Sequence, residues 1–157
     1  MTGLWVLVAT VVAALAAGAV LYARNGRIRP ARPGDTGTAG GQGPALPEPV
    51  AAALAPGTVT LVQISTTFCA PCRHTRAVLG PLAARTEGLD HVDLDVTHQP
   101  EVAHALGVLR TPTTIAFSEH GRELLRVSGV PKPAELLGAL EPHLVPRAER
   151  GSHSEGG

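Results

Sequence analysis

The sequence predicts an α/β fold, in which a mixed central sheet is flanked by helices and preceded by one N-terminal transmembrane helix. Three observations predict this arrangement. An apolar run without charge opens the chain, a segment rich in glycine and proline follows it, and strand-like and helix-like apolar patterns then alternate from residue 50 to residue 145. A length of 157 residues suits one such domain with a small appendage.

The apolar run at the N-terminus has the length of a membrane span. Residues 1–23 carry no charged side chain, and residues 4–22 are almost wholly Leu, Val and Ala. As a helix, the run covers roughly 30 Å, which is about the thickness of the hydrocarbon core of a bilayer. Trp5 and Tyr22 stand near its ends, where aromatic rings favour the interface. We therefore expect a membrane anchor; the alternative is a cleaved signal peptide, which has a shorter apolar region with basic residues before it.

The charge beside this span predicts its orientation. No arginine precedes the apolar run, and four follow it closely: Arg24, Arg27, Arg29 and Arg32. Since basic residues next to a span favour the cytoplasmic side, we expect a single-pass protein of the cell membrane whose soluble domain faces the cytoplasm. An extracytoplasmic domain is the alternative orientation.

Two segments have the composition of flexible chain. Residues 24–49 hold six glycines and five prolines with few large apolar side chains, so they cannot bury enough surface to offset chain entropy. We expect a flexible linker there and, for the same reason, a disordered tail over residues 146–157. Residues 50–145 remain for one compact domain.

The strands of this domain are predicted from β-branched and alternating segments. Residues 58–65 are mostly apolar, as in a strand buried on both faces, and residues 91–96 alternate polar and apolar side chains, as in a half-buried strand. Residues 113–118 and 123–127 flank His120-Gly121, which we expect to form the turn of a hairpin.

Four helices are expected around these strands. They cover residues 49–55, 70–85 and 100–107, and the segment that begins at Pro133. Gly80-Pro81 should kink or break the second helix, because proline lacks the backbone N–H that an inner turn needs. From the first strand onward, the predicted order is β-α-β-α-β-β-α.

Net charge and cysteine count exclude two classes of protein. The 13 Lys and Arg residues equal the 13 Asp and Glu residues, so the chain lacks the surplus positive charge of a broad nucleic-acid interface. Two cysteines are too few for a small scaffold held together by disulfides. We therefore expect no nucleic-acid partner.

Both cysteines stand in one tetrapeptide, Cys69-Ala70-Pro71-Cys72, where the first strand passes into the next helix. Cys69 at the helix N-terminus meets the positive end of the helix dipole and free N–H groups, which favour its thiolate. Cys72 lies one turn further on the same face, close enough to form a disulfide with Cys69. The spacing predicts an exposed nucleophile, Cys69, and a more buried resolving thiol, Cys72, between which a disulfide forms and breaks.

Zinc binding is an alternative use of this cysteine pair. Tetrahedral zinc needs two further ligands, but the sequence has no other cysteine, and no paired ligand spacing is found among His74, His91, His98 and His104. The remaining zinc arrangement is a dimer in which each of two chains supplies its cysteine pair. We expect no metal.

Charged side chains near the pair are expected to be solvated. His74 follows Cys72 by two residues and is assigned to the outer face of the helix, with a place beside the dithiol as the alternative. Asp93 and Asp95 share one face of the half-buried strand and are expected to face water. Arg73 and Arg76 should make the surface beside the dithiol basic.

The domain resembles the thioredoxin family over residues 50–145. The resemblance rests on the strand and FCAPC block of residues 59–72, on Thr111-Pro112-Thr113, on the hairpin between Phe117 and Gly121, and on Gly129 before the last helix. It implies a thioredoxin-like fold with a redox-active disulfide between the two cysteines. It also implies that the bond before Pro112 is cis and that the loop holding it faces the dithiol.

The resemblance further implies which residues contact a substrate. In the family, the loop with the cis-proline docks extended substrate backbone, so we expect Thr111 and Pro112 to contact the substrate and Thr111 to discriminate among substrates. The residues around the first cysteine complete this surface: Phe68, Ala70 and Pro71.

The sequence departs from the family pattern in three features, one of which is a pair of residues. Phe68 replaces the usual Trp before the first cysteine, and Ala70-Pro71 replaces Gly-Pro between the cysteines. Gln63 stands where the family has a buried Asp that relays a proton to or from the resolving thiol, and a glutamine cannot act as an acid or base. His91 is matched to the Lys partner of that Asp. Our hypothesis is that disulfide exchange persists, while resolution by Cys72 is slower or is assisted by water or by His91.

Together with the predicted membrane anchor, the resemblance implies a membrane-anchored thiol–disulfide oxidoreductase that reduces protein disulfides without a metal or organic cofactor. A thioredoxin reductase or another thiol donor would regenerate its dithiol. Two alternatives are an extracytoplasmic reductase or oxidant that serves secreted proteins or cytochrome c maturation, and a non-enzymatic module that binds a partner in the groove beside Pro112.

Overall fold

The computed structural model describes residues 2–24, 26–31 and 46–144. The predicted tail and residues 32–45 of the predicted linker lie outside these ranges. Five strands form one sheet in the order β1-β5-β4-β2-β3. Their bounds are Ile28–Pro30 (β1), Val59–Ser65 (β2), Leu89–Asp95 (β3), Thr113–Phe117 (β4) and Glu123–Ser128 (β5). The sheet is mixed, as predicted, because β2 and β3 are parallel and the other neighbouring pairs are antiparallel.

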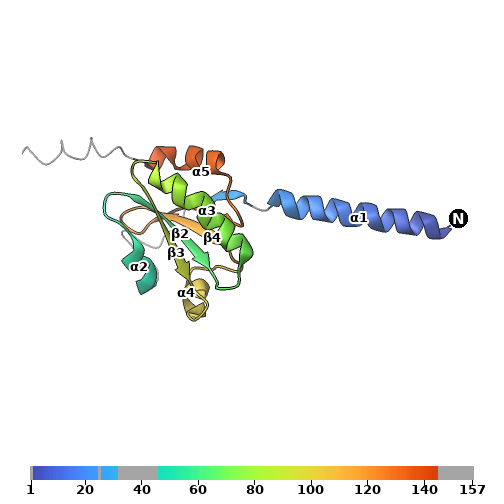
Figure 1. Ribbon diagram of the computed structural model, residues 1–157, viewed down its shortest axis with the longest axis horizontal. Helices are drawn as coiled ribbons and strands as arrows, with labels where there is room; N and C mark the ends of the chain where they lie inside the picture. The colour runs from blue at the N-terminus through green and yellow to red at the C-terminus, as the bar shows by residue number, and fades with distance from the viewer. Residues whose placement is uncertain (1, 25, 32–45, 145–157) are drawn as a thin grey trace, which may run out of the picture.

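Helices cover both faces of this sheet (Figure 1). Their bounds are Thr2–Arg24 (α1), Glu48–Ala53 (α2), Ala70–Ala84 (α3), Pro100–Ala105 (α4) and Pro133–Leu140 (α5), followed by a 3₁₀ turn, Glu141–His143 (η1). The α/β order predicted for the domain is confirmed, including the hairpin between β4 and β5, where Gly121 has a φ of 77°.

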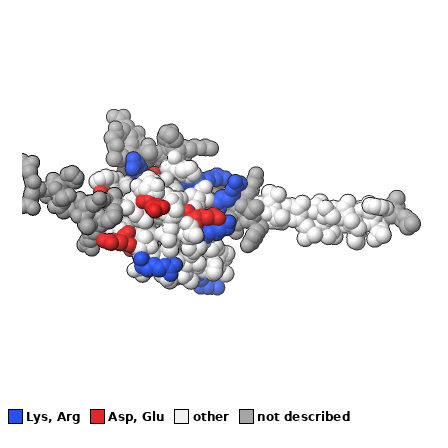
Figure 2. Space-filling model, turned by 90° about the horizontal axis from the view of Figure 1, so that it is seen from above, with Lys and Arg blue, Asp and Glu red and all other residues white. Residues whose placement is uncertain are grey.

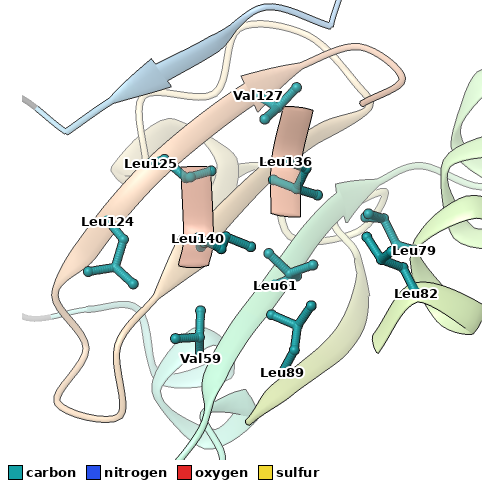
Figure 3. Packing of buried hydrophobic residues seen from close by; sticks show 11 residues of the cluster. Val59, Leu61, Leu79, Leu82, Leu89, Leu124, Leu125, Val127, Leu136 and Leu140 are labelled. Carbon is teal, nitrogen blue, oxygen red and sulfur yellow. The ribbon is translucent and has the colours of Figure 1, made fainter. Parts of the chain in front are cut away.

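Strand β2 lies between two apolar cores. On one face Leu61 packs with residues of α3 and α5, such as Leu79 and Leu136 (Figure 3). On the other face Val62 belongs to a second core with residues of α2 and α4, including Val102. All seven residues of β2 are buried, which confirms the prediction of a strand covered on both faces. This double burial fixes the position at which the chain leaves β2.

Helix α3 continues through Pro81, where the sequence predicted a kink or break. Pro81 is itself exposed, whereas Leu79 and Leu82 on either side of it are fully buried against the sheet. Burial of two leucines contributes about 1.5–3 kcal/mol each. That contribution is comparable to the cost of a proline inside a helix, about 3 kcal/mol, so the last turn of α3 stays helical despite the missing hydrogen bond.

Strand β1 corrects the linker prediction, because it lies within the segment expected to be flexible. Its three residues pair with β5, in the register Ile28↔Val127 to Pro30↔Leu125. Backbone hydrogen bonds flank the strand, from the Gly26 N–H to the Ser128 carbonyl at 2.8 Å and from the Ala31 N–H to the Leu124 carbonyl at 3.1 Å. A proline is tolerated here because β1 is an edge strand. The folded unit therefore begins near residue 26.

Helix α1 projects from this folded unit (Figure 1). Its stretch Gly3–Leu21 is long and apolar enough to cross a membrane, and the side chains of that stretch are exposed. A signal sequence near the N-terminus meets the same two criteria of length and composition. The helix is therefore consistent with either an anchor or a signal sequence.

Candidate active site

The two cysteines of the chain form a disulfide at the junction of β2 and α3. Their sulfurs are 1.99 Å apart and their Cα atoms 5.2 Å apart. The buried strand β2 ends at Ser65, and Cys69 is the N-cap of α3. Pro71 occupies the first turn of the helix, where its missing N–H leaves no helical bond unmade. Burial of β2 on both faces thus places the pair at the side of the sheet where β2 ends. This side, formed by strand ends and not by an outer strand, is named the dithiol edge.

The start of α3 directs backbone donors at Cys69. The Cys72 N–H donates to Cys69 Sγ at 3.2 Å. Such a donor, together with the helix dipole, favours the Cys69 thiolate once the disulfide is reduced. The relative exposure of the two residues follows the predicted order, at 8% for Cys69 and 2% for Cys72. Cys69 is nevertheless less open than the exposed residue that the sequence predicted.

The loop before β4 reaches the same edge. The Thr111–Pro112 peptide bond is cis, as the family resemblance implied, and Pro112 is buried. The Gly129 N–H donates to the Pro112 carbonyl at 2.8 Å. The hydroxyls of Thr66 and Thr111 lie 3.4 Å apart, which joins this loop to the one that leads to Cys69.

Two large apolar side chains are exposed in the loops of this edge. Phe68, directly before Cys69, is 96% exposed, and Leu109, three residues before Pro112, is 98% exposed. Ala70 and Pro71 are exposed as well. The sequence predicted Phe68, Ala70 and Pro71 as part of this surface, but it did not predict Leu109. The available signal was a second apolar residue after Val108 in the short segment between Gly107 and Pro112.

Beneath the disulfide, Gln63 connects α3 to β3. Gln63 is fully buried, and its Nε2 donates to the Cys72 carbonyl at 3.0 Å. Its Oε1 lies 3.3 Å from His91 Nε2. Burial lowers the pKa of His91 below its ordinary value of 6.5, against the opposing effect of Asp93 and Asp90. The structure thus brings the predicted pair, Gln63 and His91, into contact under Cys72.

Asp93 is the residue that the sequence analysis misjudged. The strand register places Asp93 directly beside Gln63 and places His91 beside Leu61. One carboxylate oxygen of Asp93 pairs with Arg76 of α3, and the other, Oδ1, is buried without a hydrogen-bond partner among the described residues. Its side chain is 14% exposed, so the expectation that it faces water was wrong. Helix α3 covers it, because β3 packs against that helix.

Asp95 is exposed, as expected, and serves the loop that precedes Cys69. It accepts hydrogen bonds from the Thr97 N–H at 2.8 Å and from the Thr67 hydroxyl at 3.2 Å. Hydrogen bonds from Thr97, in the first place from its side chain, lower the pKa of Asp95. The ionised carboxylate therefore holds the ends of two loops together.

Other polar groups take no part in this arrangement. His74 and Arg73 are exposed on α3, as predicted. A cavity of about 450 Å³ lies at the opposite end of the sheet, where it is lined by Gly57, Thr58, Ser118, His120 and Arg122. Within the described ranges, no group of three or more His, Cys, Asp or Glu residues is arranged to hold a metal ion.

Comparison with known proteins identifies relatives of this domain. A family model described as Thioredoxin matches residues 50–141. The thioredoxin of Staphylococcus aureus is 37% identical over 87 residues, which are 55% of this chain and 83% of that protein.

Two solved structures are similar to the domain. A thioredoxin variant from Halobacterium salinarum has a TM-score of 0.51 and 26% identity, over 57% of this chain and 77% of that one. A thioredoxin from Nicotiana alata has a TM-score of 0.51 and 28% identity, over 60% and 80% of the two chains. The matched part of the chain includes the disulfide, Gln63 and the loop with the cis-proline.

Proposed function

The chain belongs to the thioredoxin family and is a thiol–disulfide oxidoreductase with the CxxC pair Cys69–Cys72, and we propose that it reduces protein disulfides from a membrane anchor. The observation that carries the proposal is the position of the pair. The disulfide lies at the N-terminus of α3, beside the loop of the buried Pro112. Phe68 and Leu109 supply exposed apolar surface for a protein substrate.

In the proposed reaction, the reduced domain transfers two electrons to the substrate. The Cys69 thiolate attacks one sulfur of the substrate disulfide, which forms a mixed disulfide and releases the other substrate sulfur as a thiolate. Cys72 then loses its proton and attacks Cys69 Sγ. The substrate leaves as a dithiol after taking up two protons, and Cys69–Cys72 is oxidised. A thioredoxin reductase or another thiol donor returns the pair to the dithiol.

The second step needs a route for the Cys72 proton. Gln63 contacts the Cys72 backbone but cannot itself take up a proton. His91 contacts Gln63, and burial lowers the pKa of His91 below 6.5, so the imidazole is neutral near pH 7 and one ring nitrogen can accept a proton, as a weaker base than an exposed histidine. We infer that His91 assists resolution by accepting the Cys72 proton through an intervening water molecule. Thr111 would contact the substrate next to the disulfide and select among substrates.

Membrane attachment is the second part of the proposal. The apolar side chains of α1 are exposed and do not pack against the described part of the domain, as expected of a helix that contacts lipid. Arg24, Arg27 and Arg29 follow the span, which favours a cytoplasmic domain. An extracytoplasmic domain would instead receive electrons through a membrane thiol carrier.

Single substitutions of the two cysteines test the redox proposal. Because resolution requires the second thiol, Cys72→Ser should accumulate a mixed disulfide at Cys69 when incubated with a disulfide substrate such as insulin. Cys69→Ser should form no such adduct and reduce no insulin. Mass spectrometry under alkylating conditions detects the adducts. Adducts formed at Cys72 in the Cys69→Ser variant, at the rate seen for Cys69, would contradict the assignment of Cys69 as the nucleophile. Wild-type activity in both variants would exclude the mechanism.

A further inference from the structure

The strand directions show where the membrane helix joins the sheet. Strand β2 runs toward the dithiol edge and ends there, and β4, antiparallel to it, begins there with Thr113 opposite Ile64. Strand β5 returns to the same edge, with Ser128 opposite Thr113. Strand β1 is antiparallel to β5 and starts with Ile28 opposite Val127. The chain therefore enters the sheet from α1 at the dithiol edge.

Gly26 attaches this entry point to the domain. Its N–H donates to the Ser128 carbonyl, and its φ of 76° suits glycine. A Cβ at this position would lie 2.4 Å from the Val130 carbonyl oxygen, so the backbone approaches too closely for any other residue. Arg24, the last residue of α1, is only two residues away, which limits its Cα to about 7 Å from that of Gly26.

The disulfide lies close to this attachment. Three strand spacings separate β1 from β2 in the sheet order, which corresponds to roughly 14 Å. Figure 1 shows α1 leaving the domain on the side toward which the N-terminal end of α3 points. The opposite edge, with His120 in the β4–β5 turn, is about 20 Å further along the strands.

The charge on this side of the domain suits a bilayer surface. Figure 2 shows Lys and Arg atoms on the side from which α1 projects, with Asp or Glu atoms beside them. Three exposed arginines stand at the dithiol edge: Arg27 at the entry, Arg73 in the first turn of α3 and Arg110 in the loop before Pro112. Carboxylates on this side include Asp95, which accepts hydrogen bonds from Thr67 and Thr97, and Glu101 in the first turn of α4. Anionic lipid headgroups attract such an edge.

From this geometry we propose that the domain is held with its dithiol edge facing the bilayer, and that its substrate is a disulfide of a membrane protein close to the membrane surface. The inference rests on the proposed membrane span and disulfide exchange. Because Arg24 and Gly26 are only two residues apart in sequence, the entry point of β1 stays close to the end of α1, so a disulfide near the surface meets the Cys69–Cys72 pair at a raised effective concentration.

Fluorescence quenching by lipid measures the placement directly. The full chain is reconstituted in phosphatidylcholine–phosphatidylglycerol vesicles that contain headgroup-nitroxide lipid. In the first variant, Cys72→Ser, bimane is attached to Cys69. In the second variant, which carries Cys69→Ser, Cys72→Ser and His120→Cys, bimane is attached at position 120. We expect several-fold stronger quenching at position 69 than at position 120. Equal quenching, or stronger quenching at position 120, would overturn the placement, as would a chain that fails to float with the vesicles.

Two matched insertions test the substrate class with both cysteines intact. Ten Gly and Ser residues between Arg24 and Asn25 should free the domain from α1, whereas the same insertion between Gly40 and Gly41 leaves the α1–β1 connection unchanged. The substrates are insulin and a co-reconstituted single-span peptide with a disulfide next to the bilayer. We expect the first insertion to slow reduction of the peptide by roughly tenfold while insulin reduction is retained, and the second insertion to change neither rate.

The outcomes separate this inference from the proposed function. Identical effects of the two insertions on the membrane peptide, with insulin still reduced, would overturn the membrane-facing site and leave the oxidoreductase in place. If the unmodified chain does not reduce insulin, the proposed function is overturned. The quenching comparison would still decide which edge faces the bilayer.

Discussion

Gln63 is the buried residue through which strand β2 contacts the helix that bears the disulfide. Gln63→Leu keeps the approximate volume but removes the hydrogen bonds to the Cys72 carbonyl and to His91. We expect it to lower the free energy of unfolding by about 1–3 kcal/mol. Hydrogen exchange of the β2 and β4 amides in detergent-solubilised chain measures this change.

An exposed glutamine gives the matched control for that measurement. Gln99 precedes α4, is exposed and makes no side-chain capping hydrogen bond. Gln99→Leu should change the same free energy by no more than about 0.5 kcal/mol. Equal effects of the two substitutions would contradict the structural role assigned to Gln63.

His91 makes stability depend on pH. Burial lowers its folded-state pKa below 6.5, so the unfolded chain binds more protons as the pH falls below that value. The stabilising contribution is therefore fully present above about pH 6.5 and is lost as the pH falls through the folded-state pKa. We expect His91→Gln to lose less unfolding free energy than the wild type between neutral pH and about pH 5.

Hydrogen exchange over this pH range, corrected for intrinsic exchange rates, supplies the comparison. His74→Gln, which replaces an exposed imidazole on α3, is the control variant. Identical pH slopes for His91→Gln and His74→Gln would show that the His91 imidazole is not the source of the effect.

At the scale of elements, β1 is attached by one glycine. Gly26→Ala places a methyl group against the Val130 carbonyl at a positive φ. The expected cost is about 1–3 kcal/mol, seen as faster exchange of the Ala31 N–H, which donates to Leu124. Gly138→Ala is the control, since that position in α5 has open space and should gain about 0.5–1 kcal/mol in helix stability. Unchanged exchange at Ala31 in the Gly26 variant would show that β1 is not held in this way.

The elements that the sequence predicted are those with a regular apolar pattern. The mostly apolar run of β2 is such a pattern, and all seven residues of that strand are buried in the fold. Strand β1 has no such pattern, because its three residues depend on the edge of β5, a partner about 100 residues away in sequence. Its existence could not be deduced from local composition.

The site was predictable where its residues are adjacent in sequence. Cys69 and Cys72 follow from one tetrapeptide and a helix start. Asp93 was misjudged because its burial depends on α3 packing over β3, which an alternating strand pattern does not reveal. Leu109 was missed because exposure of an apolar residue in a loop is a property of the folded surface.

On the scale of the whole molecule, a helix suited to a membrane, a short edge strand and a disulfide meet at one edge of one sheet. The thioredoxin fold provides the residues for disulfide exchange. The pairing of β1 with β5 places the chain that comes from α1 at the same side of the sheet as the disulfide. This arrangement predicts selectivity for disulfides by location as well as by sequence. Reduction of any substrate by this domain requires reversible exchange at the Cys69–Cys72 pair.

The reduction potential of that pair tests this claim most directly. The full chain is equilibrated in graded thiol–disulfide buffers, alkylated, and its free thiols are counted by mass. We predict one reversible two-electron transition, with a potential closer to the roughly −270 mV of thioredoxin than to the roughly −120 mV of the oxidant DsbA. A potential near the latter value would contradict a reductase, and the absence of any reversible transition would contradict disulfide exchange itself.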